Sequence, residues 1–161
     1  MDLMDNKTIS NKASSITTDA QTINRLFEQM NELYNAVARK RNLSSNAFSI
    51  LYSLYECDGL SQKQLSDRAY IPKQTVSYTV KKLREEGFIS EEAFSGRESR
   101  LMLTQQGREQ VEADITPVIE AEHHALSTYG EKHRRTVIAA FESYVAQLKE
   151  SFIASGLLDN K

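Results

Sequence analysis

Hydrophobic residues recur every three or four positions over most of the chain, which is the pattern of amphipathic helices. Residues 1–22 are polar and lack this periodicity, so we expect a flexible N-terminal arm there. Helical periodicity begins directly after them and predicts a long helix within residues 23–43. A second helix follows, with Ser44 or Ser45 as its N-cap and the Asp58-Gly59 turn at its end.

Two short helical patterns then lie end to end in residues 61–83. Ser61 and Gln64 have the spacing of a capping box, and Leu65 is the inward anchor of the first helix. Pro72 marks the first turn of the second helix. The apolar stripe of that helix is spaced i, i+4, i+7 and consists of Val76, Val80 and Leu83. Its outward face carries long hydrogen-bonding side chains, namely Lys73, Gln74, Ser77, Tyr78 and Lys81. This is the helix-turn-helix arrangement, in which the second helix enters the major groove of DNA.

A β-hairpin is predicted directly after these helices, beyond a helix-ending Gly87. Two short strand-like segments, residues 88–93 and 100–104, flank a glycine-containing tip at residues 94–99. The tip holds Arg97 where such a wing can reach the adjacent minor groove, whose negative potential attracts arginine. The pattern over residues 44–104 therefore predicts a winged helix-turn-helix domain.

The C-terminal third of the chain returns to helical periodicity. Thr104 is a suitable N-cap for a helix that Pro117 should kink and Gly130 should end, and the last helix begins near Glu131. Residues 23–43 and 105–155 carry more apolar surface than a winged core requires, so we expect them to be N- and C-terminal dimerisation helices. The predicted fold class is mainly α with a small β wing.

Charge is distributed unevenly along the 161 residues. The segment from Ser61 to Arg84 has six basic residues and one acid, a local charge of +5 that leaves −7 for the rest of a chain with net charge −2. A basic segment on an acidic body is the electrostatic pattern of a protein that binds a phosphate backbone. The chain has no apolar run of the ~18 residues that a membrane span needs, so we predict a cytoplasmic protein with no membrane contact.

The order of these elements resembles that of the MarR family of winged helix-turn-helix transcription regulators. The resemblance covers roughly residues 23–153 and is most specific in LSQKQLSDRAYIPKQTVSYTVKKLREEGFI and SGRESRLMLTQQGRE. Family members typically read Asp-x-Arg-Asp-x-Arg across the wing, followed by Leu-Thr-x-x-Gly. Here Ser95 and Glu98 stand in place of the two acids, and the matching positions are Arg97, Arg100, Leu103, Thr104 and Gly107.

The resemblance implies a homodimer that binds a pseudo-palindromic operator in double-stranded DNA and usually represses. It places Ser61, Gln62 and Lys63 against phosphates. It places further residues at base edges, neighbouring phosphates and the wing contact: Lys73, Gln74, Thr75, Ser77, Tyr78, Lys81, Arg97 and Arg100. Among these, Gln74 suits adenine, because an amide can pair with its N6 and N7. Many members have Arg where this chain has Tyr78, so sequence preference should differ.

The resemblance also implies a small aromatic or lipophilic effector, for which Tyr34, Phe48, Tyr52 and Tyr55 are candidate walls; as aromatic residues they also suit a core.

The lone Cys57 allows a redox-responsive regulator, although Glu56 and Asp58 oppose its thiolate. His123, His124 and His133 lack the spacing of metal ligands, so we predict no metal and no cofactor. No nucleophile with a matched base is apparent, so we expect no enzyme and no catalytic residue. A winged-helix module that contacts a protein is the main alternative.

Overall fold

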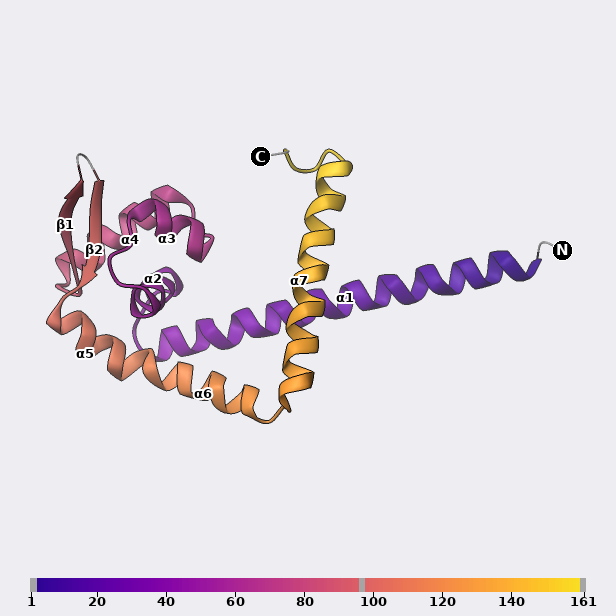
Figure 1. The fold of residues 1–161 in the computed structure, drawn as a ribbon, viewed down its shortest axis with the longest axis horizontal. Helices are drawn as coiled ribbons and strands as arrows, with labels where there is room; N and C mark the ends of the chain where they lie inside the picture. The colour runs from indigo at the N-terminus through magenta and orange to yellow at the C-terminus, as the bar shows by residue number, and fades with distance from the viewer. Residues whose placement is uncertain (1–2, 96–97, 160–161) are drawn as a thin grey trace. The chain divides into compact units, whose positions relative to one another are not determined.

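A computed structural model describes residues 3–95 and 98–159, and the chain divides into two compact units, Met1–Ile115 and Thr116–Lys161. The first unit contains, in order, α1 (Leu3–Lys40), α2 (Ser45–Glu56), α3 (Gln62–Ala69), α4 (Lys73–Glu85), β1 (Ile89–Ser95), β2 (Glu98–Leu103) and α5 (Gln105–Asp114). The second unit contains α6 (Thr116–Ser127) and α7 (Glu131–Ala154). Helices thus dominate both units, and the first also holds a two-stranded sheet (Figure 1). None of the described helices is long and apolar enough to cross a membrane.

The core of the first unit lies where α2, α3 and α4 meet beside the β1–β2 hairpin (Figure 1). Leu51 and Leu54 of α2, Leu65 of α3 and Val76 of α4 are each 0% exposed. The hairpin closes this core with Leu101, which is also 0% exposed. Burial of apolar side chains from four elements fixes the helix-turn-helix against the wing, at ~25 cal/mol for each Å² of apolar surface removed from water.

The predicted helix caps are confirmed. Ser44 is the N-cap of α2, where its hydroxyl accepts a hydrogen bond from the Ala47 N–H at 3.1 Å. Ser61 and Gln64 form both bonds of the capping box at the start of α3. Thr104 caps α5 and accepts the Gly107 N–H at 2.9 Å. Each cap satisfies backbone donors that the first helical turn leaves unpaired.

The hairpin is antiparallel, with Ile89 opposite Leu103 and Ala93 opposite Ser99, and its register shifts between Ala93 and Ser95. The strands extend further toward the tip than the sequence predicts. Leu60 adds an isolated bridge to the sheet, because its backbone carbonyl accepts the Leu101 N–H at 2.9 Å. The wing is therefore attached by backbone hydrogen bonds to the segment that leads into α3.

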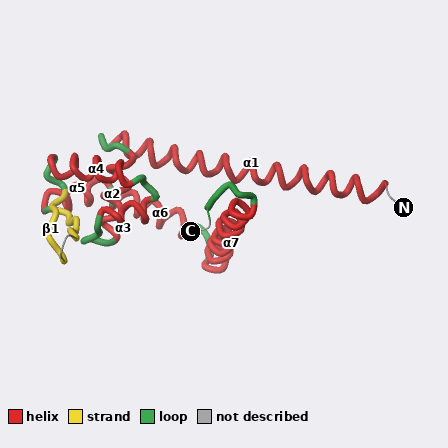
Figure 2. Tube along the Cα trace, turned by 90° about the horizontal axis from the view of Figure 1, so that it is seen from above, coloured by secondary structure: helices red, strands yellow, loops and turns green. Residues whose placement is uncertain are grey.

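Three further sequence predictions about element boundaries are wrong. The first helix begins at Leu3 rather than near residue 23, and Figure 2 shows α1 as one uninterrupted helix. Ala, Lys and Gln favour helices and Ser tolerates them, so the low hydrophobicity of residues 1–22 does not prevent a helix there. The helix from Gln105 does not continue through Pro117 with a kink. It ends at Asp114, and Pro117 lies in the first turn of α6, where its missing N–H is harmless. Pro72, finally, is the N-cap of α4 rather than its first turn.

Whether residues 1–22 act as an arm, and whether residues 23–43, 44–104 and 105–155 are functional divisions, stays a prediction.

Candidate nucleic-acid interface

Helix α4 has one buried and one exposed face. Val76, Val80 and Leu83 are at most 1% exposed, so the predicted apolar stripe is confirmed. Thr79 joins them at 5% exposed, because its hydroxyl donates to the Thr75 carbonyl at 2.8 Å and needs no water. The opposite face is open to solvent and comprises Lys73, Gln74, Ser77, Tyr78 and Lys81. Thr75 is half-buried between the two faces.

The start of α3 presents a second polar edge. The Ser61 hydroxyl accepts the Gln64 N–H at 3.2 Å, and the Ser61 N–H donates to Gln64 Oε1 at 2.8 Å. A serine hydroxyl that accepts one bond still has its own proton to donate. Gln62 is half-buried and Lys63 is exposed. This edge can therefore offer hydroxyl, amide and ammonium donors to an anion.

Ion pairs divide the basic residues of this region into two groups. Arg68 donates a hydrogen bond to Glu56 at 2.7 Å, and this bond and the negative charge of Glu56 raise the pKa of Arg68. Lys81 and Lys82 lie 3.9 and 3.8 Å from glutamates one helical turn on, in exposed pairs of little strength. Among the described side chains, those of residues 15–94 and 99–159, Lys63 and Lys73 form no ion pair. Their positive charges are the least compensated on this face.

The wing carries an arginine stacked on an aromatic ring. The guanidinium carbon of Arg100 lies 3.3 Å from the centroid of the Phe94 ring, a cation–π contact on an exposed surface. Arg97, the other predicted wing arginine, lies outside the described residues. Below the tip, Glu91 accepts hydrogen bonds from both Arg84 of α4 and Ser99 of β2. The ion pair between Arg84 of α4 and Glu91 of β1 thus links the candidate recognition helix to the wing.

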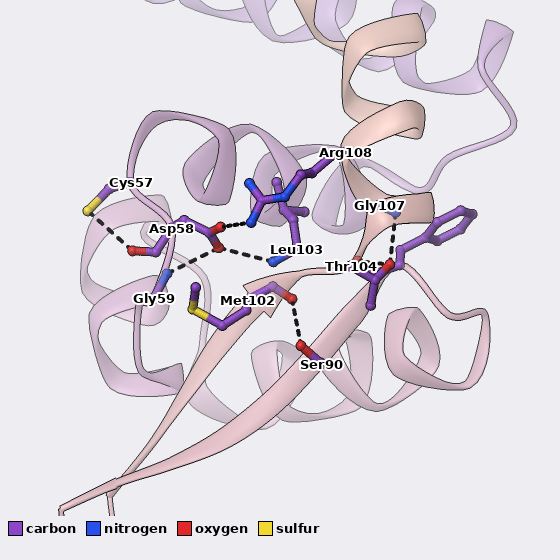
Figure 3. A network of polar contacts seen from close by, with 10 residues as sticks. Cys57, Asp58, Gly59, Ser90, Met102, Leu103, Thr104, Gly107 and Arg108 are labelled. Atoms are coloured by element: carbon purple, nitrogen blue, oxygen red, sulfur yellow. Dashed lines mark hydrogen bonds and ion pairs between the residues drawn. The ribbon is translucent and has the colours of Figure 1, made fainter.

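The base of the wing is fixed by one carboxylate, that of Asp58 (Figure 3). Asp58 Oδ1 accepts the Gly59 N–H at 3.2 Å and the Leu103 N–H at 3.0 Å. Asp58 Oδ2 pairs with the Arg108 guanidinium at 2.8 Å. One side chain just beyond the end of α2 therefore holds the end of β2 and the first turn of α5.

Thr104 and Gly107 fix the other side of the wing base (Figure 3). The Thr104 hydroxyl donates to the Gly87 carbonyl at 2.6 Å. A Cβ atom on Gly107 would lie only 2.0 Å from the Phe88 carbonyl oxygen, so no larger residue fits without backbone movement. Gly87 itself has φ of 81°, a conformation that favours glycine. These contacts explain physically why the Leu-Thr-x-x-Gly pattern needs its threonine and its glycine.

The four candidate effector residues do not share one environment. Phe48 is 4% exposed and belongs to the core, and its ring lies 6.3 Å from that of Tyr52. Tyr34 and Tyr55 are 36% and 44% exposed. Tyr55 is therefore exposed, whereas Phe48 on the same helix is buried. The structure brings Phe48 and Tyr52 together, and the role of all four as effector walls stays a prediction.

Cys57 is exposed, and its sulfur lies 4.0 Å from the Asp58 carbonyl oxygen (Figure 3). Among the described residues, no three His, Cys, Asp or Glu side chains are grouped so that they could hold a metal ion.

Sequence reasoning missed Phe94, Asp58 and Glu91 as residues that position the interface. Phe94 and Arg100 come together only through the hairpin register. Asp58 and Leu103 are 45 residues apart in the chain. The sequence shows a turn-forming Asp-Gly pair at Asp58, but it does not show which groups the Asp58 carboxylate binds.

A short helix pair with a polar outer face, followed by a hairpin that packs against it, defines a winged helix-turn-helix protein. A sequence model described as the MarR family matches residues 41–98. An uncharacterized HTH-type transcriptional regulator of Bacillus subtilis, YwoH, is 24% identical over 134 residues, which are 78% of this chain and 98% of that protein.

Solved structures agree with this similarity. A MarR transcriptional regulator from Methanosarcina mazei Go1 aligns with a TM-score of 0.63 and 25% identity, over 82% of this chain and 90% of that one. The S. aureus MepR–DNA complex aligns with a TM-score of 0.65 and 20% identity, over 80% of this chain and 96% of that one. The chain is thus similar in sequence and in fold to winged helix-turn-helix transcriptional regulators of the MarR family.

Proposed function

We propose that this regulator is a homodimeric repressor that binds a pseudo-palindromic operator and is released by a small-molecule effector. The proposed DNA contacts are Ser61, Gln62 and Lys63 at the start of α3 and Lys73, Gln74, Thr75, Ser77, Tyr78 and Lys81 on α4. Arg97 and Arg100 are the proposed wing contacts. We place the protein in the cytoplasm, where its DNA would be, and assign it no catalytic activity.

One observation carries the DNA contacts: the exposed face of α4 is polar and begins with a lysine that has no ion pair among the described residues. In a helix-turn-helix, the N-terminal residues of the recognition helix read base edges and the first helix crosses the backbone. Lys73 and Gln74 occupy the first two positions of α4. Phosphate contacts would position the helix, and Gln74 would supply base discrimination.

Two variants separate these roles on a duplex selected from a random library. Lys73→Ala should weaken binding to all sequences and reduce the salt slope by about 1, since one phosphate contact is lost. Gln74→Ala should relax preference at one base pair by about 1–3 kcal/mol and leave the salt slope unchanged. Lys149→Ala, at an exposed lysine of α7, is the matched control. Equal binding by all three variants and the parent protein would remove α4 from the interface.

Exposed apolar stripes support the homodimer. On α1, Leu26 and Met30 are 55% and 46% exposed and lie one turn apart. On α7, Val137 and Val145 are 63% and 49% exposed and share a face two turns apart. Apolar rows on long helices are costly in water and are usually covered by a partner helix. A second copy of the chain offers the same rows and would also provide a second recognition helix for the other half-site.

The effector is proposed from the family, with Tyr34, Phe48, Tyr52 and Tyr55 as candidate walls. It could act only by binding the DNA-competent and DNA-incompetent states with different affinity. Titrating a small aromatic carboxylate into the protein–operator complex should release labelled DNA. A response to peroxide that disappears in Cys57→Ser would instead favour the redox-responsive alternative. Salt-insensitive binding to a protein partner, without operator selection, would favour an interaction module.

A further inference from the structure

Tyr70 has an unfavourable backbone conformation in the turn between α3 and α4. Its φ and ψ are 53° and 34°, in the left-handed region that L-residues with a Cβ avoid. Among the described residues other than glycine, Asn42 alone shares a positive φ. Asparagine tolerates this region, but a bulky aromatic residue in it is a genuine outlier. A glycine would adopt the same turn without this cost.

The surrounding turn holds Tyr70 in this conformation. The Tyr70 N–H ends α3 by donating to the Ser66 carbonyl, which also accepts the Ile71 N–H at 3.2 Å. The Ser66 hydroxyl donates back to the Ile71 carbonyl at 2.7 Å. Ile71 is only 8% exposed, and Pro72 directly follows it as the N-cap of α4. The backbone at Tyr70 is thus fixed from both sides.

Packing does not account for a tyrosine at this position. Its side chain is 92% exposed, the largest value among the exposed large hydrophobic residues of the described chain. The ring contributes almost nothing to the core, and its backbone is less favourable than that of glycine. A strained residue that persists without a folding benefit is a candidate for a functional role.

The position of Tyr70 defines that role. It lies three residues before Lys73, at the end of α4 that enters the major groove in helix-turn-helix docking. A neutral phenol is one of the groups that donate hydrogen bonds to DNA phosphates. We propose that Tyr70 is a further DNA contact, whose hydroxyl donates to a backbone phosphate at the edge of the groove entered by α4. This inference rests on the proposed orientation of α4 toward DNA.

Two variants at Tyr70 test the contact, with the full-length protein and labelled duplexes. Tyr70→Phe removes only the hydroxyl and should weaken binding to selected and random duplexes alike, by about tenfold. Its salt slope should match that of the parent protein, because a neutral donor displaces no counterion. Tyr70→Gly should weaken binding at least as much while raising Tm by about 2–4 °C, because it relieves the left-handed strain.

Asn42→Gly is the matched control, since it changes the other positive-φ residue in the loop before α2. It should leave DNA affinity unchanged. If Tyr70→Phe and Tyr70→Gly both bind as the parent does while Lys73→Ala binds more weakly, the Tyr70 contact is overturned and the proposed function stands. If the parent protein itself shows no salt-dependent duplex binding, the proposed function and this contact both fail. Weaker binding by both Tyr70 variants, at an unchanged salt slope, supports the contact.

Discussion

Gly107 is the position where a single added carbon should do most damage. Its Cβ would lie 2.0 Å from the Phe88 carbonyl oxygen and 2.9 Å from the Phe88 carbonyl carbon, both backbone atoms. Gly107→Ala should therefore push α5 away from the base of the wing and destabilise the fold by about 3 kcal/mol, the upper end for overpacking. Urea unfolding measures the loss.

Gly130→Ala provides the matched comparison, because nothing lies within 4 Å of a Cβ built at Gly130. Gly130 is the N-cap of α7, so alanine should cost less than about 1 kcal/mol there. Equal losses at the two glycines would show that the close approach to Phe88 has no energetic weight.

Phe94 should affect DNA binding rather than folding. It is 54% exposed and contacts the Arg100 guanidinium. In this wing Ser95 replaces the first acid of the Asp-x-Arg-Asp-x-Arg pattern. An exposed cation–π pair contributes about 0.5–1 kcal/mol, so Phe94→Ala should lower operator affinity about threefold by leaving Arg100 less well oriented. Phe94→Tyr keeps the ring face and should retain affinity. Fluorescence anisotropy distinguishes the two variants. Full affinity in Phe94→Ala would show that the ring does not orient Arg100 for DNA binding.

Local sequence patterns predict contacts between residues that are near one another in the chain. The Ser61–Gln64 capping box and the Val76–Val80 stripe both follow from helical spacing alone. The Phe94–Arg100 pair, by contrast, depends on a register shift in the hairpin. Tyr70 adopts its left-handed conformation in a turn that also buries Ile71. No rule of spacing contains either of these facts.

At the scale of elements, the wing is held to α2 by Asp58. Asp58→Ala would leave the N–H of the buried Leu103 without its acceptor and should destabilise the first unit by about 2 kcal/mol. Asp58→Asn keeps an oxygen for that N–H and loses only the exposed pair with Arg108, so about 0.5 kcal/mol should be lost. Chemical denaturation gives both values. If asparagine costs as much as alanine, the ion pair rather than the backbone hydrogen bond holds the wing.

The order of the elements was predictable because periodicity and turn residues mark them, but some ends were not. The long helix begins at Leu3 because polar residues can continue a helix that a hydrophobic pattern no longer requires. The sequence predicts a kink at Pro117, whereas the structure has a helix break before it. Proline suits the first turn of a new helix as well as a bend within one helix. Sequence alone does not decide between these two uses of proline.

For the whole molecule, the proposed dimer depends on the apolar rows of α1 and α7. Replacing both Val137 and Val145 by glutamate puts two charges on one row of α7, whose side chains are largely exposed within a single chain. The double variant should keep its helical content, because little is buried there in the monomer, and should sediment as a monomer at micromolar concentration. Lys132→Glu, at an exposed residue on the opposite face of α7, should remain dimeric. A double variant that sediments like the parent would place the dimer contact elsewhere.

The central proposal is that two copies of this winged domain read one inverted repeat. Selection of bound duplexes from a random library, followed by titration of the enriched sequence at several salt concentrations, tests it most directly. We expect an inverted repeat with half-sites about one helical turn apart, and a log affinity that falls linearly with log salt by about 0.9 per phosphate contacted. No enriched repeat, or an affinity that does not change with salt, would contradict the proposal.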